Sequence, residues 1–338
     1  MAVYTHVSAE SLAAFLTRYD VGELVSAKGI AEGVENSNYL VDTTGPKGEG
    51  GRYILTLYEK RVAADDLPFF MALLDHLDAK GLPVPPAIKD RSGKAIQQLE
   101  GRPACLIKFL PGVSLSHPTP AQAWAAGEAL GRMHAALADF APERPNSLGV
   151  NSWQPLLDRC GGGLDRIAPG LDRRLGLALD EVLAFWPQGW GDRASAGSGI
   201  TDLPIGAIHA DLFPDNVLMR GNDVSGLIDF YFACTDVRAY DLAVTHTAWA
   251  FDAFGGPLAP AVGRALVDGY TAAFPLSEAE RRALWVLAKG ACLRFALTRA
   301  WDWLNTPADA LVTRKDPLAY VRRLDWYDDH DNCTAAFA

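Results

Sequence analysis

Apolar side chains in the first third of the chain follow two different periods. Residues 8–19 carry them at helical spacing, which predicts a short amphipathic helix. After this helix, short apolar runs alternate with turn residues, and the Gly- and Pro-rich segment 45–51 is a strong turn signal. Strands are predicted at 23–26, 38–42 and 53–58, and two further short strands end at 104–110. The pattern therefore predicts a small, strand-rich part of the protein.

Longer helical patterns dominate the rest of the chain. One helix is predicted within the strand-rich part, from Asp66 to Lys80, with Asp66 as its N-cap. Pro111-Gly112 marks the change of character, and Thr119-Pro120 then starts a helix by the cap-then-proline rule. This helix continues to about residue 137, and others are predicted near 164–186, 240–252, 260–273 and 277–304. A larger helical part therefore follows the strand-rich one.

Bulk composition narrows the class of protein. A chain of 338 residues exceeds the size at which one hydrophobic core keeps growing, so two lobes are expected. The formal net charge of −10 argues against a nucleic-acid partner. The five cysteines contain no CxxC pair, which is typical of reduced thiols. Neither a signal peptide nor a run of 18 apolar residues is visible, so a cytoplasmic protein without a membrane partner is predicted.

The candidate chemistry lies in the segment 206–230. It contains His209-x-Asp211, then Asn216, and then Asp229 at the end of an apolar run. One carboxylate can orient an acceptor hydroxyl or take its proton, while an amide and a second carboxylate can hold Mg²⁺ against nucleotide phosphates. Taken singly, these are ordinary cap and turn residues, but their order and spacing favour phosphoryl transfer. His209 is expected to pack inward and hold the loop, because no second His or Cys cluster stands nearby to complete a metal site.

A hairpin is expected to bring two of these residues together. The short apolar runs 217–219 and 226–228 flank a turn segment. If Asn222-Asp223 form a two-residue loop, Asn216 faces Asp229, and directly opposed Cβ atoms lie roughly 4.5–5.5 Å apart. Two oxygen donors this close can share one Mg²⁺ ion. Asn-Asp is a weaker turn signal than Asn-Gly, so a register one residue away stays open.

These motifs resemble a known superfamily. His-x-Asp-(x4)-Asn, with Ile-Asp-Phe thirteen residues after the asparagine, is similar to the aminoglycoside phosphotransferase and choline kinase superfamily. Within it, the chain resembles the homoserine kinases over nearly its full length. The segments that carry this closer resemblance are 29–39, 54–59, 66–70, 81–85, 208–218, 226–234, 293–295 and 301–303.

The resemblance implies an α+β, protein-kinase-like bilobal fold. Residues 1–108 would form a small antiparallel-sheet lobe that binds the nucleotide, and residues 109–338 a larger, mainly helical lobe that holds the catalytic and substrate sites. The hinge would lie at 108–112. The implied reaction uses ATP and Mg²⁺ and transfers the γ-phosphate to the side-chain hydroxyl of L-homoserine. Another small-molecule kinase, acting on choline, an aminoglycoside or a sugar, is the nearest alternative, and a nucleotide-binding pseudokinase is the more distant one.

The resemblance also assigns roles to single residues. Asp211 would be the catalytic base, Asn216 and Asp229 would bind Mg²⁺, and Asp241 would brace the catalytic loop. The nucleotide would contact Gly29, Gly33, Asn36 and Asn38 in a loop over the phosphates, and Lys108, Phe109 and Leu110 at the hinge.

A zwitterionic substrate needs donors for its carboxylate and an anion near its ammonium group. Arg294 or Arg299 is the candidate for the carboxylate, and Asp215 or Asp236 for the ammonium. Trp301 and Trp303 are expected to pack as core.

One departure from the superfamily concerns the third strand, where relatives place a Lys or Arg that pairs with the phosphates. The matching residue here is Thr56. Lys28, Lys60 and Arg61 are the nearby cations that could substitute for it. The acidic partner of such a cation would be Asp65 or Asp66.

Overall fold

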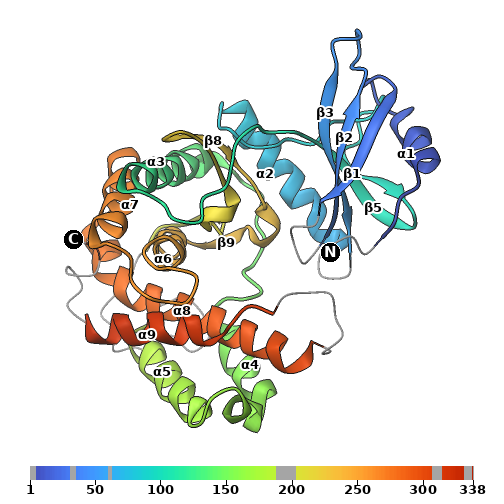
Figure 1. Cartoon of the computed structure of the whole chain (residues 1–338). Helices are drawn as coiled ribbons and strands as arrows, with labels where there is room; N and C mark the ends of the chain where they lie inside the picture. The colour runs from blue at the N-terminus through green and yellow to red at the C-terminus, as the bar shows by residue number, and fades with distance from the viewer. Residues whose placement is uncertain are drawn as a thin grey trace. The chain divides into compact units, whose positions relative to one another are not determined.

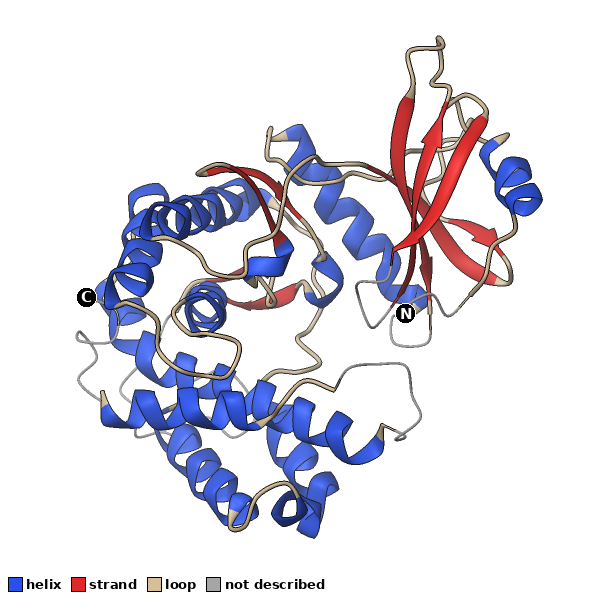
Figure 2. Ribbon diagram, in the orientation of Figure 1, coloured by secondary structure: helices blue, strands red, loops and turns tan. Residues whose placement is uncertain are grey.

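The computed structural model describes residues 5–30, 36–59, 63–187, 203–306 and 314–330, together with Phe337. These residues form two compact units that divide between Pro111 and Gly112 (Figure 1). Strands dominate the first unit and helices the second (Figure 2). This is the α+β architecture that the sequence predicts. No helix of the described residues has the length and apolar character needed to cross a membrane.

The first unit is built on a five-stranded sheet in which every neighbouring pair is antiparallel, with the order β1-β2-β3-β5-β4. The strands are β1 (Leu24–Ile30), β2 (Asn36–Thr43), β3 (Gly51–Tyr58), β4 (Gln97–Leu99) and β5 (Arg102–Lys108). Gly45, Gly48 and Gly50 have positive φ in the connection between β2 and β3. Glycine reaches this conformation at little cost, which explains the strong turn signal in the sequence.

Helices pack on both faces of the sheet. α1 (Ala9–Leu16) begins at Ser8, whose hydroxyl caps the helix, and its apolar side packs against one face, called here the α1 face. Residues of this face in the shared core are Tyr39, Val41, Leu55, Leu57, Ala104 and Leu106. α2 (Leu67–Ala79) contacts the opposite face, because Met71 Sδ lies 3.9 Å from Cys105 Sγ. By strand register, this α2 face also carries Asn38 and Thr56.

The second unit consists of helices around two short strand pairs, β6–β9 and β7–β8. The strands are β6 (Ile205–Ile208), β7 (Val217–Arg220), β8 (Asp223–Leu227) and β9 (Cys234–Val237). The helices are α3 (Pro120–Ala136), α4 (Trp153–Cys160), α5 (Leu171–Phe185), α6 (Arg238–Trp249), α7 (Pro260–Ala273), α8 (Glu278–Asn305) and α9 (Leu318–Asp329). α6 is buried from Ala239 to Trp249 and forms the centre of this unit, where Figure 1 draws it end-on.

The predicted helix near 164–186 is wrong in its first part, and two helices were missed. Pro169 and Gly170 interrupt the stretch, since the residue before a proline avoids the α-helical region and Gly170 has a φ of 77°. α5 therefore starts only at Leu171. The missed helices are α4 and α9. α9 is rich in charged residues, and it buries one of them, Arg323, which blurs the apolar stripe that sequence reasoning depends on.

Glycines allow α3 and α7 to pack at very short distance. A Cβ atom on Gly127 of α3 would collide with the backbone carbonyl of Leu266 in α7. A Cβ atom on Gly269 of α7 would collide with the carbonyl of Trp124 in α3. Because each obstacle is a backbone atom, which cannot rotate away, the close crossing of α3 and α7 requires residues without a side chain at these two positions.

We expect Gly127→Ala to lower the free energy of unfolding by about 1–3 kcal/mol, the usual cost of forcing an extra carbon into a packed interior. Gly176→Ala is the matched control, since this α5 glycine has open space around its Cβ position. There the same change should stabilise by roughly 0.5–1 kcal/mol, the gain in helix propensity. Denaturant unfolding of both variants measures the difference. Equal unfolding midpoints would contradict the close crossing.

Candidate active site

Asp241 anchors the loop that follows β6. Its carboxylate is fully buried in α6 and accepts two backbone hydrogen bonds, from His209 N–H at 2.7 Å and Ala210 N–H at 2.8 Å. His134 of α3 contacts the same carboxylate, with Nε2 at 3.0 Å from Oδ2. Burial by itself would raise the pKa of Asp241, but the hydrogen bonds from the His134 ring and the His209 backbone outweigh it, and the pKa is lowered. The expected brace for the loop is confirmed.

His209 joins this loop to the next strand pair. Its ring is fully buried against Phe230, and burial lowers its pKa, so the imidazole is neutral. Nε2 lies 3.0 Å from the carbonyl oxygen of Ile228, which requires an N–H at Nε2. Nδ1 is then free to accept the backbone N–H of Asp211, at 3.3 Å. His209 therefore packs inward and holds the loop, as the sequence predicts.

The β7–β8 hairpin is flanked by the predicted metal ligands, with Asn216 just before β7 and Asp229 two residues after β8, and its register differs by one residue from the expected one. The pairs are Val217 with Leu227 and Leu218 with Gly226, followed by a bulge. The loop is Gly221-Asn222, where Gly221 has a φ of 65°. Ile228 N–H donates to the carbonyl oxygen of Asn216 at 3.0 Å. The expected direct pairing of Asn216 with Asp229 is therefore wrong, because Asp229 lies one residue further along.

Two residues near Asp211 have left-handed backbone conformations that only glycine adopts easily. Ala210 has a φ of 62° and Asp229 a φ of 64°. Such conformations cost energy and persist where surrounding contacts enforce them. At Ala210 the enforcing contact is the hydrogen bond to Asp241, and at Asp229 the chain turns into the 3₁₀ turn Phe230–Phe232. The fold thus imposes strain on the residues that flank the site.

Asn216 presents its amide in an orientation that suits a metal ligand. Its Nδ2 donates to the backbone oxygen of Asp211 at 2.7 Å and lies 3.3 Å from Asp211 Oδ2. With Nδ2 occupied in this way, Oδ1 is the atom left to bind a cation. Asp229 is exposed on the neighbouring strand end. An amide oxygen and a carboxylate form a donor set that fits a hard divalent cation.

The charges around Asp211 are mixed. Its side chain is half-buried, and burial raises the pKa of its carboxyl to about 8. The positive charges of Arg294 and Lys315 lower this pKa, whereas the carboxylates of Asp229 and Asp215 raise it. Asp211 is therefore surrounded by two cations and two carboxylates within the second unit. A cation bound at Asp229 would relieve the repulsion between the carboxylates.

Comparisons with known proteins identify the family of the chain. The chain is 52% identical to a homoserine kinase of Zymomonas mobilis, covering 97% of each protein. It is 50% identical to a homoserine kinase of Granulibacter bethesdensis, covering 99% of each. Residues 26–280 match the model of the phosphotransferase enzyme family. The chain belongs to this family, on its homoserine kinase branch. The resemblance inferred from the motifs is thereby confirmed.

The fold is shared with kinases of low sequence identity. An amicoumacin kinase of known structure, in complex with AMP-PNP and Ca²⁺, superposes with a TM-score of 0.69 at 15% identity. The match covers 96% of this chain and 94% of the other. At this identity the comparison supports the kinase-like fold, and family membership brings with it the use of ATP.

The predicted nucleotide residues lie in the first unit, where several side chains are already hydrogen-bonded. Gly29 is exposed in β1. Asn36 is buried and its Oδ1 accepts Glu59 N–H at 3.3 Å, while Asn38 Oδ1 accepts the Thr56 hydroxyl at 2.8 Å. Gly33 lies outside the described residues. Lys108 ends β5 with an exposed side chain, and the half-buried Phe109 and Leu110 follow it.

Thr56 does not present a free donor in place of the strand lysine. It is fully buried, and its hydroxyl is used by Asn38. By register, Lys28 lies on the same α2 face with an exposed side chain, whereas Arg52 on this face is paired with Asp42 at 2.7 Å. The other candidates, Lys60 and Arg61, lie outside the described residues.

The candidates for an acidic partner lie just before α2. Asp65 is exposed, and Asp66 occupies the N-cap position of α2 without capping it through its side chain. The expectation that Asp66 caps this helix is therefore met in position only.

The residues predicted to bind the substrate differ in their burial and in whether their side chains already form hydrogen bonds with other protein groups. Arg294 is only 2% exposed and donates to the carbonyl of Ala210 at 2.6 Å, so it supports the loop from behind. Asp236 is equally buried and accepts Asn146 Nδ2 at 2.6 Å. Arg299 is half-buried, and Asp215 is exposed.

Sequence reasoning missed Lys315 and misjudged two tryptophans. Lys315 acts on the pKa of Asp211, yet it precedes a helix that was itself not predicted. Trp301 and Trp303 were expected in the core, but both are half-buried. Arginine side chains cover them, with Arg159 over Trp301 at 4.1 Å and Arg314 over Trp303 at 4.7 Å. Long side chains that shield aromatic rings in this way leave no signal in the hydrophobic pattern.

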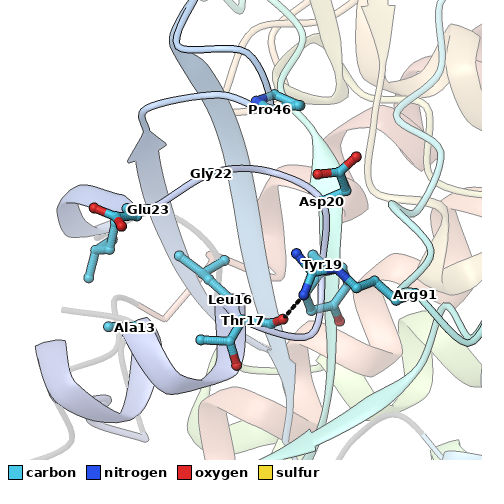
Figure 3. Close-up of a pocket in the computed structure, with 10 residues that line it drawn as sticks. Ala13, Leu16, Thr17, Tyr19, Asp20, Gly22, Glu23, Pro46 and Arg91 are labelled. Carbon is cyan, nitrogen blue, oxygen red and sulfur yellow. Dashed lines mark hydrogen bonds between the residues drawn. The ribbon is translucent and has the colours of Figure 1, made fainter.

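A separate hollow of about 570 Å³ lies in the first unit, beside α1 and the start of β1 (Figure 3). Leu16, Asp20, Glu23 and Arg91 are among its lining residues, and Arg91 donates to the Thr17 carbonyl at 2.8 Å. None of the predicted nucleotide, metal or catalytic residues lines it.

Asp241→Asn tests the brace. The amide can replace only one of the two acceptor oxygens, so its NH₂ group would face a backbone N–H, and we expect a loss of about 3 kcal/mol of stability at neutral pH. The folded-state pKa of Asp241 lies below the ordinary 3.8. Its contribution is therefore complete above that pH and is lost as the pH falls through the lowered pKa.

Denaturant unfolding of wild type and variant between pH 3 and 8 measures this difference. The difference in unfolding free energy between wild type and Asp241→Asn should be constant near neutral pH and should become smaller in acid. Asp268→Asn, an exposed carboxylate on α7, is the control and should change stability little. A difference in unfolding free energy that grows in acid would contradict the lowered pKa of Asp241.

Proposed function

We propose that the chain is an ATP-dependent homoserine kinase, which transfers the γ-phosphate of ATP to the side-chain hydroxyl of L-homoserine and forms O-phospho-L-homoserine for threonine biosynthesis. The observation that carries this proposal is the identity of about half the residues to homoserine kinases over nearly the whole length of both proteins. The convergence of Asp211, Asn216 and Asp229 on one loop and one hairpin supports the reaction class.

Asp211 is proposed as the catalytic base. Its half-buried carboxylate would accept a hydrogen bond from the homoserine hydroxyl and direct the oxygen lone pair at the γ-phosphorus. As the new P–O bond forms, the bond to the ADP oxygen breaks and the hydroxyl proton passes to Asp211. The contacts of Asn216 and His209 to Asp211 limit the orientations that this loop can adopt. Positioning of this kind supplies much of the rate enhancement in phosphoryl transfer.

Mg²⁺ is proposed as the cation held by Asn216 Oδ1 and the Asp229 carboxylate. When bound, it would neutralise charge on the transferred phosphoryl group. The hydrogen bonds of Asn216 Nδ2 to Asp211 support this assignment, because they orient the amide oxygen away from the catalytic carboxylate.

Residues 1–108 are proposed to bind the nucleotide, and residues 109–338 to hold the catalytic and substrate sites. Gly29, Gly33 and Asn38 would belong to the loop over the phosphates, and the backbone at 108–110 would meet adenine. The buried Asn36 would support this loop from within the sheet. Lys28 would replace the strand lysine. A cytoplasmic location is part of the same proposal, since ATP and amino-acid intermediates are cytoplasmic metabolites.

The substrate groups are proposed to meet the side chains that the protein itself leaves available. Asp215, which is exposed, is better placed for the ammonium group than Asp236, which is buried and already accepts a hydrogen bond from Asn146. Arg294 and Arg299 each donate to a backbone carbonyl of the protein, at Ala210 and Asp316. A clamp for both charged ends would separate homoserine from acceptors that lack a carboxylate.

An acceptor panel tests the substrate assignment. With ATP and Mg²⁺, the purified protein should phosphorylate L-homoserine with a kcat/KM at least about 100-fold above that for choline, an aminoglycoside or a hexose, because a site built for polar groups discriminates strongly. Coupled ADP release measures each rate, with acceptor-free protein as the blank. Turnover of choline with inert homoserine would replace the proposed substrate by the nearest alternative.

Asp211→Asn tests the catalytic role. Turnover should fall by about 10²–10⁴-fold, the usual contribution of a positioned base. Binding of ATP, measured by calorimetry, should be retained. The buried Thr56 at the strand-lysine position raises the alternative of a pseudokinase, and a wild-type protein that binds ATP but transfers no phosphate to any acceptor would establish it.

A further inference from the structure

An aromatic cluster lies directly behind the proposed catalytic loop. Phe213 belongs to this loop, and its backbone N–H donates to the Asp211 carbonyl at 2.8 Å. Its ring meets Phe295 of α8 edge-on, with centroids 5.1 Å apart, and Phe295 stacks on Tyr320 of α9 at 4.8 Å. The cluster therefore ties the position of Asp211 to α8 and to the segment that leads into α9.

Lys315 extends from that segment over the cluster. Its Nζ lies 5.9 Å from the centroid of the Phe213 ring, two residues along the chain from Asp211. The backbone next to it is held, because Arg299 Nη1 donates to the Asp316 carbonyl at 3.3 Å and Asp316 Oδ1 accepts Leu318 N–H at 2.9 Å. The attachment point of Lys315 is thus fixed, while its side chain is exposed.

The ammonium group of Lys315 is not used by the described part of the protein. None of the described carboxylates forms an ion pair with it, and its Nζ faces the ring of Phe213. The other cations nearby are engaged: Arg294 bonds the Ala210 carbonyl, and Arg299 stacks on Tyr320 at 4.5 Å while it bonds Asp316. Lys315 is therefore an exposed cation beside this loop whose ammonium group is not paired with any described carboxylate.

We propose that Lys315 binds the carboxylate of the amino-acid substrate and so determines the specificity of the site for acceptors that carry a carboxylate. Arg299 then acts as a positioning residue, which holds the Lys315 segment through the Asp316 carbonyl. The inference rests on the proposed function, because it assigns one end of homoserine to a residue next to the proposed base.

The chemistry of the acceptor supports this assignment. Homoserine places its hydroxyl and its carboxylate at opposite ends of a short chain, so the group that binds the carboxylate must lie within a few ångströms of the base. Lys315 meets this requirement, since its Nζ lies 5.9 Å from the ring of Phe213, whose backbone N–H donates to the Asp211 carbonyl. A fully solvated surface lysine would have no such neighbour. A primary ammonium group on a flexible stem can also follow the substrate as it settles against Asp211.

The test compares two acceptors that differ only in the carboxylate, L-homoserine and 3-aminopropan-1-ol. In Lys315→Met, kcat/KM for homoserine should fall roughly 10- to 100-fold, the effect of losing one charge-assisted hydrogen bond. kcat/KM for 3-aminopropan-1-ol and the KM for ATP should change less than about threefold, within the spread of neutral surface changes. Lys315→Arg, which keeps the charge, should recover much of the activity on homoserine.

If turnover of 3-aminopropan-1-ol is too slow to measure, an inhibition constant tests the same proposal. L-2-aminobutyrate has the carboxylate but no hydroxyl, and its inhibition constant against homoserine should rise by the same factor in Lys315→Met. Arg282→Met is the matched control: Arg282 is exposed, pairs with Glu278 at 2.8 Å, and lies about 25 Å along α8 from Arg299 at 1.5 Å per residue. It should change none of these values.

Distinct results separate the possible failures. An equal loss with both acceptors, an unchanged inhibition constant, or a rise confined to the KM for ATP would each overturn the carboxylate role of Lys315. Absence of homoserine phosphorylation in the wild type would instead overturn the proposed function itself. An unfolding temperature of Lys315→Met equal to that of the wild type would exclude misfolding as the cause of a loss of activity.

Discussion

The site depends on one buried carboxylate. Asp241 lies in the most deeply buried helix and receives the backbone N–H groups of two consecutive loop residues. A charge in this environment is costly unless it is fully hydrogen-bonded, so removing either partner group would leave an expensive defect. The loop consequently has little freedom at His209 and Ala210, and the next residue is Asp211. The strained φ of Ala210 is a consequence of the same contact.

From this anchor the hydrogen bonds run outward in a fixed order. His209 connects the loop to the backbone before Asp229, and Asn216 connects Asp211 to the hairpin. His209 uses both of its ring nitrogens in these contacts, whereas Asn216 uses its Nδ2 and keeps its amide oxygen available. The protein therefore positions the proposed base through hydrogen bonds that start at the Asp241 carboxylate and run through the loop to Asn216. The cations, by contrast, are arranged on the aromatic cluster, where their charge can act on a ligand.

The difference between Arg294 and Lys315 shows why burial matters for assigning a substrate group. From sequence, Arg294 was a natural candidate, because it belongs to a segment shared with the family. In the structure its guanidinium supports the loop from the interior. Lys315 attracted no attention in the sequence, since it lies among other charged residues. Its importance comes from the helix that follows it and from the ring of Phe213, two features that depend on contacts between distant segments.

The sequence by itself determined the division into a strand-rich and a helical part, the residues of the proposed catalytic motif, and the inward role of His209. These follow from local patterns: side-chain periodicity, caps, turns and the spacing of polar residues, all of which act within a few residues. Only the tertiary structure decided the hairpin register, because the bulge after Leu218 depends on how both strands pack. It also decided which arginines are buried, that α9 exists, and that Lys315 meets the loop. Those outcomes rest on packing between segments far apart in the chain, where no local pattern records the partner.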